Sequence, residues 1–430
     1  MKEGDLSFAL SRRFAPLFGT QFLGALNDNL FKTALFVMMS YHGLGKNDTI
    51  PPEQMLNLGA LLFILPYFLF SSVSGQWSTR FDKARIARIV KIMEIAIMAA
   101  AAYGFYIQSA AILLAMLFCM GTHSTLFGPL KYAILPDYLN DKELMMGNSL
   151  IESGTFLAIL SGQIAGTALA GMPHIWIMCL VVLIAVCGLL SSAFMPYVGA
   201  ADPGFPVDPN IFRSTRQLIK DTFAQRELYT AIIGISWFWL IGAVYTTQLP
   251  TFTQKHLGGN DSVFNLMLAL FSVGIAAGSV LCSKISKHRL NLRLVGIGTL
   301  GLTVFGLSLV AATHGNHFHT GQQQGISAFL KHGFAYPVIL CMTAIGFFGG
   351  FFSVPLYTWL QTASSSKFRA GAIAANNIIN GLFMVAAALL SAVLLKISDS
   401  ITLLYLTVAL GNIVLLAYLV RLDGRFIKKG

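Results

Sequence analysis

The chain has 430 residues, of which 55% are hydrophobic and 11% are charged, and its mean hydropathy is +0.69. This composition excludes a soluble globular domain as the bulk of the chain and indicates an integral membrane protein. The net charge of +11 lies mainly in the connections between apolar stretches, where membrane orientation and anionic headgroups account for it, so we expect no nucleic-acid partner.

Twelve apolar stretches follow one another along the chain. Each is long enough, as a helix, to cross a bilayer. An even number of crossings places both termini on the same side, and the sequence predicts an all-α membrane protein with twelve transmembrane helices. The stretches cover approximately 14–40, 55–79, 86–107, 109–133, 145–170, 174–197, 228–254, 262–283, 292–313, 335–360, 370–395 and 401–421.

The basic residues alternate between dense and sparse connections. Of the 29 Lys and Arg residues, 24 fall on the side that holds the termini. The other side receives Lys46, Lys255, Lys331 and Lys396, and Lys32 lies inside a stretch. By the positive-inside rule, both termini are predicted to be cytoplasmic. The first stretch is too long and too polar at its centre for a cleavable signal peptide, so we expect it to remain as the first helix.

The longest connection on the predicted cytoplasmic side runs from 198 to 227. It begins GAADPGFPVDPN and then becomes basic and amphipathic, which is typical of a linker between domains. We therefore predict a six-helix lobe over 1–197, a cytoplasmic linker over 198–227 and a second six-helix lobe over 228–430.

A weak internal repeat favours two pseudo-symmetric lobes. Two sets of residues match: PLKY at 129–132 with PLYT at 355–358, and Asn148 and Glu152 with Asn376 and Asn380. Parallel repeats of this kind let a transporter place one site between its lobes and rock around it. Chance similarity between apolar helices is the alternative.

The first stretch carries charge near its middle. Asp28 lies in the sequence GALNDNLF between Asn27 and Asn29, and Lys32 follows one turn later on the same face. A charge at the centre of a membrane helix costs about 2.5 to 3.5 kcal/mol on insertion scales, so one that remains there usually faces a cavity. We predict that Asp28 contacts a polar headgroup or a proton, and a self-neutralising pair with Lys32 is the alternative.

The fourth and fifth stretches carry a second set of ionisable groups. His123 lies near the middle of the fourth stretch and Lys131 two turns later, and Glu152 lies about two turns into the fifth. Antiparallel neighbours would bring Lys131 and Glu152 to similar depth, where they could pair as a gate or as a fixed strut. His123 is a ligand, a proton carrier or a packing histidine. Glu94, after Lys91 in the third stretch, lies near the predicted cytoplasmic edge and is interpreted as structural.

The second half has no ionisable residue in the middle of any stretch, but it is rich in aromatic and neutral polar groups. Charges in one lobe and aromatic groups in the other suit an amphiphilic substrate with a charged head and an apolar body. Tryptophans near helix ends also form ordinary interfacial belts, which is the alternative. The candidate residues are Trp237, Trp239, Tyr245, Thr246, Gln248, Tyr357, Trp359, Gln361, Asn376, Asn377 and Asn380.

Two further patterns do not predict a metal or another cofactor. His314, His317, His319 and His332 share one external connection, but their spacing fits no standard zinc pattern. The five cysteines all lie in apolar stretches without CxxC spacing and are interpreted as packing thiols.

At three places the chain resembles the major facilitator superfamily and, more narrowly, the bacterial lysophospholipid transporter family. The first half carries the resemblance, and the second half agrees in helix count and hydropathy. The matching stretches are GALNDNLF at 24–31, GPLKYAILPDYL at 128–139 and GNSLIESGTFLAILSGQIAG at 147–166.

The resemblance implies the major facilitator fold and a flippase that moves lysophospholipids, such as lysophosphatidylethanolamine or lysophosphatidylglycerol, across a bacterial inner membrane for reacylation. It implies that Asp28, Lys131 and Glu152 meet or gate the headgroup. A monomer among membrane lipids is expected. Some relatives are fused to an acyltransferase and acyl carrier protein synthetase. For this chain, we expect any such enzyme to be a separate protein.

The loop between the second and third helices departs from the superfamily pattern. That pattern begins Gly-x3-Asp-Arg, and here Thr79 stands where Asp is expected. Asp82 is a candidate for the missing acid. We expect a conformational loop that includes Gly75, Arg80, Asp82 and Arg85.

The alternative function is a proton-coupled exporter or permease for another amphiphile, such as a drug, a siderophore or a cell-wall fragment. Titration of Asp28 or Glu152 near neutral pH would favour it. The chain contains no GxSxG, Walker or HExxH motif, so we do not expect an enzyme. A non-transporting receptor of the same fold is the remaining alternative.

Overall fold

A computed structural model of the protein describes residues 6–41, 44–45, 52–287, 289–316, 318, 323–398 and 400–427. The predicted external Lys46 and two histidines of the external cluster, His317 and His319, lie outside the described residues. Among the described side chains, no three His, Cys, Asp or Glu residues form a group that could hold a metal ion.

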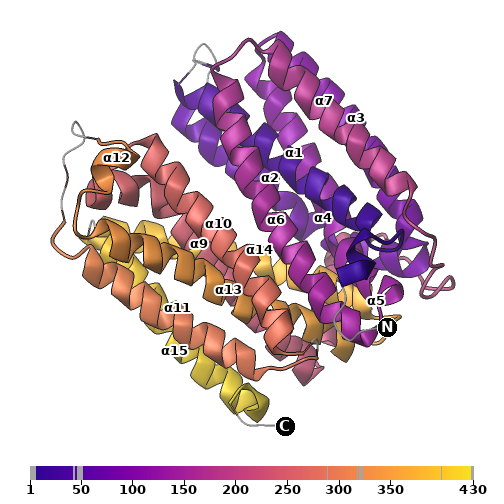
Figure 1. The fold of residues 1–430 in the computed structure, drawn as a ribbon. Coiled ribbons are helices and arrows are strands. Elements are labelled where there is room, and N and C mark those ends of the chain that lie inside the picture. The colour runs from indigo at the N-terminus through magenta and orange to yellow at the C-terminus, as the bar shows by residue number, and fades with distance from the viewer. Residues whose placement is uncertain are drawn as a thin grey trace. The chain divides into compact units, whose positions relative to one another are not determined.

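The described residues form twelve helices of 19 residues or more and no strand, as Figure 1 shows. Helices suit a membrane chain because every backbone polar group is satisfied within the segment. The long helices are α1 (Ala15–Tyr41), α2 (Pro52–Arg80), α3 (Lys83–Tyr106), α4 (Ala110–Ala133), α6 (Asp141–Ala170), α7 (Ile175–Ala193), α9 (Arg226–Leu257), α10 (Asp261–Ile285), α11 (Arg293–Ala312), α13 (Ala335–Ala363), α14 (Arg369–Ser398) and α15 (Ile401–Leu422). The short ones are η1 (Leu6–Leu10), α5 (Leu135–Tyr138), α8 (Ile211–Phe223), α12 (Ile326–Phe329) and η2 (Gly424–Phe426).

Each predicted stretch coincides with one long helix, so the predicted fold class is confirmed. Two ends differ most. Helix α6 begins at Asp141 rather than near 145, because Asn140 and Glu143 form a reciprocal capping box there. Helix α7 ends at Ala193 rather than near 197, since Pro196 follows and the residue before a proline disfavours helical backbone.

Ten of the twelve long helices are apolar enough to cross a membrane by length and composition alone. Helices α1 and α3 are not among these ten. Both carry charged residues in their interiors, Asp28 and Lys32 in α1 and Lys91 and Glu94 in α3. The two long helices outside this set both bear internal charge.

The helices divide into two compact units. Unit 1 comprises Met1–Gly147, Leu157–Gln225 and Gln361–Ile378, and unit 2 comprises Asn148–Phe156, Arg226–Leu360 and Ile379–Gly430. Helices α6 and α14 each contribute to both units, and α8 belongs to unit 1.

Unit 1 packs α2 against α4, and α7 against both α1 and α3. The pairing of α3 with α7 is visible in Figure 1. The centre of this unit is an apolar cluster in which the rings of Phe31 and Phe105 meet edge to face at 5.8 Å. Glycines let α6 pack closely against α1, because a Cβ on Gly162 would lie 2.6 Å from the Leu26 carbonyl oxygen. This packing fixes the face of α1 that carries the polar residues.

Unit 2 packs α15 against α9 and α11, and α10 against α9. The α10 and α13 backbones approach closely: a Cβ on Gly278 would overlap the Phe347 carbonyl group, and one on Gly274 would overlap that of Thr343. Small residues at such crossings let membrane helices gain packing contacts that lipid cannot replace.

Candidate functional site

A fully buried ion pair lies at the centre of unit 1. Lys91 and Glu94 are one turn apart on α3, their side chains are 0% exposed, and Nζ lies 2.5 Å from Oε2. Lys91 Nζ also lies 5.5 Å from the centre of the Phe127 ring. Desolvating two charges costs several kcal/mol per ion unless partners replace the water, so the surroundings of this pair are informative.

Two other helices contact the buried carboxylate. Asn27 on α1 donates a hydrogen bond from Nδ2 to Glu94 Oε1 at 2.8 Å, and it also reaches the Val181 carbonyl oxygen of α7 at 3.1 Å. His123 on α4 brings Nε2 within 3.2 Å of Glu94 Oε2, although the geometry does not meet the criteria for a hydrogen bond. Glu94 therefore links α1, α3 and α4.

Asp28 lies beside this cluster and is half-buried. Its Oδ2 accepts a hydrogen bond from the Ser124 hydroxyl of α4. Its Oδ1 is buried and has no hydrogen-bond partner among the described residues. The carboxylate thus keeps one acceptor oxygen available at the middle of a membrane helix.

Lys32 lies one turn beyond Asp28 and is also half-buried. Its Nζ lies 4.7 Å from the centre of the Phe63 ring on α2, a geometry that stabilises a cation. Among the described residues, no carboxylate lies within ion-pair distance of Lys32. The two groups share a helix face without the close contact of a self-neutralising pair.

The other candidates of unit 1 do not gather at one point. Asn29 donates to the Ala25 carbonyl oxygen of its own helix at 2.8 Å. Lys131 places Nζ 5.0 Å from the centre of the Tyr132 ring. Asn376 is 0% exposed, and neither of its amide atoms has a hydrogen-bond partner among the described residues. Lys131 and Glu152 fall in different units, so their pairing stays a prediction.

Unit 2 contains an aromatic cluster on α6, α9, α10 and α13. Phe156 stacks on Trp239 with ring centres 6.5 Å apart and meets Phe238 and Phe271 edge to face. The Trp239 indole N–H donates to the Tyr357 hydroxyl at 2.9 Å. This cluster includes two of the predicted aromatic residues, Trp239 and Tyr357, which are joined by this hydrogen bond.

Three polar residues of α6 and α14 lie in the same unit. Asn148 donates to Thr358 Oγ1 at 3.1 Å, and Asn380 accepts from the Ser236 hydroxyl at 2.8 Å. Glu152, one turn after Asn148, is 2% exposed. These contacts anchor α6 to α13 and α14 to α9.

Three further candidates of unit 2 lie apart from this cluster. Tyr245 stacks obliquely on Tyr405 with ring centres 4.6 Å apart. Trp359 packs against the C-terminal segment, with its ring 5.8 Å from that of Phe426 and 5.1 Å from the Arg425 guanidinium. Gln248 is half-buried on α9.

The predicted conformational loop joins α2 to α3. The Asp82 carboxylate caps α3 by accepting from the Arg85 backbone N–H at 2.8 Å, and it also accepts from the backbone N–H groups of Val198 and Gly199 at 2.8 and 2.7 Å. Arg80 and Arg85 are exposed. Asp82 therefore holds the segment after α7 against the start of α3.

The end of α2 also contacts the start of α14, within unit 1. A Cβ on Gly75 would lie 2.9 Å from the Ala374 Cβ. The Thr79 hydroxyl lies 3.5 Å from the Lys367 carbonyl oxygen, and the Lys367 ammonium pairs with Asp202 at 3.2 Å. Thr79, which replaces the expected Asp, thus contacts this segment without charge.

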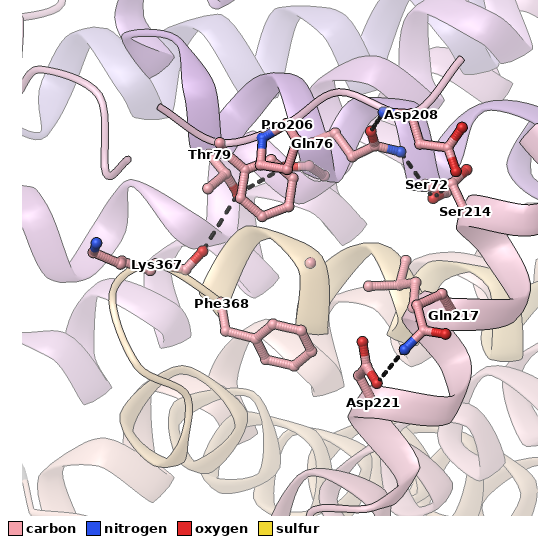
Figure 2. A pocket seen from close by; sticks show the side chains of 14 residues that line it. Ser72, Gln76, Thr79, Pro206, Asp208, Ser214, Gln217, Asp221, Lys367 and Phe368 are labelled. Carbon is pink, nitrogen blue, oxygen red and sulfur yellow. Dashed lines mark hydrogen bonds between the residues drawn. The ribbon is translucent and has the colours of Figure 1, made fainter. Parts of the chain in front are cut away.

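A pocket of about 290 Å³ lies next to this contact, and Figure 2 shows its lining. Its polar groups satisfy one another: Gln76 accepts from the Asp208 backbone N–H at 2.7 Å, and Gln217 donates to Asp221 at 2.7 Å. The Arg213 guanidinium, hydrogen-bonded to Asp208, keeps the pKa of that carboxyl below its ordinary value. The pocket holds none of the charged residues near Asp28, so we do not place the functional site there.

Replacing Asp82 with Ala is expected to lower the free energy of unfolding by about 1 to 2 kcal/mol, the upper part of the range for a lost N-cap. The upper part applies because the backbone N–H groups of Val198 and Gly199 lose their acceptor as well. Asp82→Asn keeps an oxygen acceptor and should cost less. Thermal unfolding of the purified variants in detergent measures both. An Asp82→Ala protein as stable as the wild type would contradict this role.

The major facilitator superfamily model matches residues 17–336 of the chain. The chain belongs to the major facilitator superfamily. Among curated proteins, it is 28% identical over 379 residues to the lysophospholipid transporter LplT of Cronobacter sakazakii, covering 86% of this chain and 85% of the relative. It is 26% identical over 378 residues to LplT of an Enterobacter species, with the same coverage.

Solved structures of the superfamily share the fold. The fucose:proton symporter FucP of E. coli superposes with a TM-score of 0.71 at 12% identity, covering 97% of this chain and 98% of FucP. The human organic anion transporter MFSD10 superposes with a TM-score of 0.66 at 16% identity, covering 94% of this chain and 99% of MFSD10. Superfamily membership makes this chain a multi-pass membrane transporter rather than an enzyme.

Sequence reasoning missed one residue of the charged cluster and misplaced another. Glu94 was expected near the edge of its helix, but it lies at the middle of α3, because that helix begins at Lys83 and has 24 residues. Lys91 was not among the candidates. The signal was present in the sequence as two opposite charges three residues apart inside an apolar stretch.

Proposed function

We propose that this transporter is a flippase that moves lysophospholipids across the bacterial inner membrane by alternating access, for reacylation on the inner side. The curated relatives that cover most of this chain carry the name lysophospholipid transporter. Their identity to this chain is 28% or less, so the substrate needs an argument from this chain's own residues.

The observation that carries the proposal is the arrangement of Asp28 and Lys32. Opposite charges lie one turn apart on one face of α1, without ion-pair contact between them, and Asp28 keeps a buried acceptor oxygen. A zwitterionic headgroup carries an ammonium and a phosphate in the same molecule. The ammonium would pair with Asp28 and the phosphate with Lys32, which would satisfy both protein charges and both headgroup charges in a desolvated site.

The rest of the substrate is apolar and needs a different surface. The aromatic cluster of Phe156, Phe238, Trp239 and Phe271 supplies one in unit 2, and aromatic side chains present large apolar area with little entropy to lose. We assign the acyl chain to this cluster and a gating role to Glu152 and Lys131. Two six-helix lobes, 1–197 and 228–430, would rock around the site, with the 75–85 loop and the linker over 198–227 acting at their cytoplasmic ends.

The distribution of basic residues supports an inner-membrane orientation with both termini in the cytoplasm. We propose that the transporter works as a monomer and delivers its substrate to a separate acyltransferase/acyl carrier protein synthetase. A proton-coupled exporter or permease for another amphiphile is the second candidate. Two carboxylates inside membrane helices, Asp28 and Glu152, favour it, because such groups often serve as proton relays.

Uptake of labelled lysophosphatidylethanolamine into spheroplasts, with and without a protonophore, separates the two candidates. A flippase that runs down the substrate gradient should retain uptake when the protonophore is present. Labelled lysophosphatidylglycerol and a bulky cationic drug serve as competing substrates in the same assay. Uptake that collapses with the protonophore, or competition by the drug alone, would favour the proton-coupled carrier.

A further inference from the structure

We propose that Lys91, Glu94 and His123 form a positioning network that fixes the direction in which Asp28 points. This inference rests on the proposed function, since it assigns Asp28 the substrate contact. None of the three network residues is placed in contact with substrate. Their role is to hold α1 and α4 in the rotation that presents the Asp28 carboxylate and the Ser124 hydroxyl to each other.

The first step concerns α1. Asn27 and Asp28 are consecutive residues, so their side chains leave the helix about 100° apart. Asn27 is 0% exposed and donates to Glu94, while Asp28 is half-buried and bonds to Ser124. A hydrogen bond at Asn27 therefore sets the rotation of α1, and that rotation decides where Asp28 points.

The second step is the same arrangement on α4. His123 and Ser124 are consecutive, and His123 is 2% exposed and faces Glu94 at 3.2 Å. Ser124 faces Asp28. Glu94 thus contacts the first residue of each pair, and the second residues of the two pairs bond to one another. The Glu94 carboxylate on α3 therefore connects the pair on α1 with the pair on α4.

The third step concerns Lys91, whose position is fixed by small residues. A Cβ on Gly24 of α1 would lie 2.7 Å from Lys91 Nζ, and one on Gly188 of α7 would lie 3.4 Å from it. The ammonium therefore occupies a slot that Gly24 leaves open. Held there, it neutralises Glu94 and keeps it available as the acceptor for Asn27.

Stability alone does not explain such a pair. Replacing a buried ion pair by apolar residues of similar volume is often neutral or stabilising, whereas leaving one charge alone is costly. The Lys91 and Glu94 side chains are both fully buried, in a unit that also contains a large apolar cluster. A requirement for directed hydrogen bonds next to Asp28 accounts for charges at this position.

A double-mutant cycle between Glu94→Gln and Asp28→Asn tests the network. The quantity measured is the Kd of labelled lysophosphatidylethanolamine for the purified full-length chain in nanodiscs. In the wild-type background, Glu94→Gln should raise Kd about tenfold, which corresponds to about 1.4 kcal/mol. In the Asp28→Asn background it should raise Kd less than twofold, since positioning matters only while the carboxylate is present.

Matched variants separate positioning from general damage. Glu143→Gln removes the carboxylate of another ion pair of unit 1, which joins Arg13 at 2.6 Å, and should leave Kd unchanged. Gly24→Ala should raise Kd as Glu94→Gln does, whereas Gly188→Ala, whose Cβ meets only ordinary contact distances, should not. An equal rise in Kd from Glu94→Gln in both Asp28 backgrounds would overturn the proposal.

Failure of the proposed function remains distinguishable from failure of this inference. Wild-type protein that is folded and binds no lysophospholipid would reject the function. The network is then tested without ligand, by the same cycle in thermal unfolding. The Tm shift of the double variant should differ from the sum of the two single-variant shifts by about 3 °C. Additive shifts would overturn the network as well.

Discussion

Replacing Asp28 with Asn is expected to lower the rate of lysophosphatidylethanolamine uptake about 30-fold or more. The substitution keeps the size of the side chain and its bond to Ser124 but removes the charge that would meet the headgroup ammonium. Truncating one partner of a desolvated charge pair costs about 2 kcal/mol or more, which is a factor of about 30 in affinity. Uptake into proteoliposomes that contain equal amounts of folded protein measures the effect.

The control for this substitution is Asp208→Asn, the same chemical change at a carboxylate that pairs with the exposed Arg213 guanidinium at 2.7 Å. Exposed pairs of this kind contribute little, so uptake should remain within about twofold of wild type, the range expected for a loss below about 0.4 kcal/mol. A substrate without an ammonium, such as lysophosphatidylglycerol, should lose less uptake in Asp28→Asn than lysophosphatidylethanolamine does. An equal loss of uptake for both substrates would show that Asp28 does not bind the headgroup ammonium.

Replacing Gly278 with Val is expected to prevent folding of unit 2. A Cβ at this position would overlap the Phe347 carbonyl group of α13, and the obstacle is backbone rather than the end of a flexible side chain. Overpacking commonly costs about 1 to 3 kcal/mol and more when the backbone must move. Size-exclusion profiles and Tm of the detergent-solubilised variant should show aggregation or a large loss of stability.

Gly242→Val on α9 is the matched control, because nothing lies within 4 Å of a Cβ at Gly242. This variant should fold like the wild type. A Gly278→Val protein that is monodisperse and unfolds at the wild-type temperature would show that α10 and α13 do not approach as closely as described.

Hydropathy alone predicts most of the fold. An apolar stretch of sufficient length must form a helix in lipid, so length and composition located all twelve. The errors lie at ends such as those of α6 and α7, where a capping box at Asn140 and a proline at 196 decide the boundary. These are local effects that hydropathy averages out.

The candidate site was less predictable, because contacts between helices depend on rotation as well as depth. Asp28 stood out since a charge at the middle of an apolar helix has few explanations. The contact of Asp28 with Ser124 and the contacts of Glu94 with Asn27 and His123 all join different helices, and the residues in contact are 29 to 96 positions apart in the sequence. The hydrophobic periodicity of one helix does not indicate which neighbouring helix each of its faces contacts.

Transbilayer movement of labelled lysophosphatidylethanolamine in liposomes that contain only the purified chain tests the central claim most directly. The account predicts movement well above that of protein-free liposomes, without a proton gradient, and its strong reduction by Asp28→Asn. Folded wild-type protein that moves this lipid no faster than protein-free liposomes would contradict the proposed function.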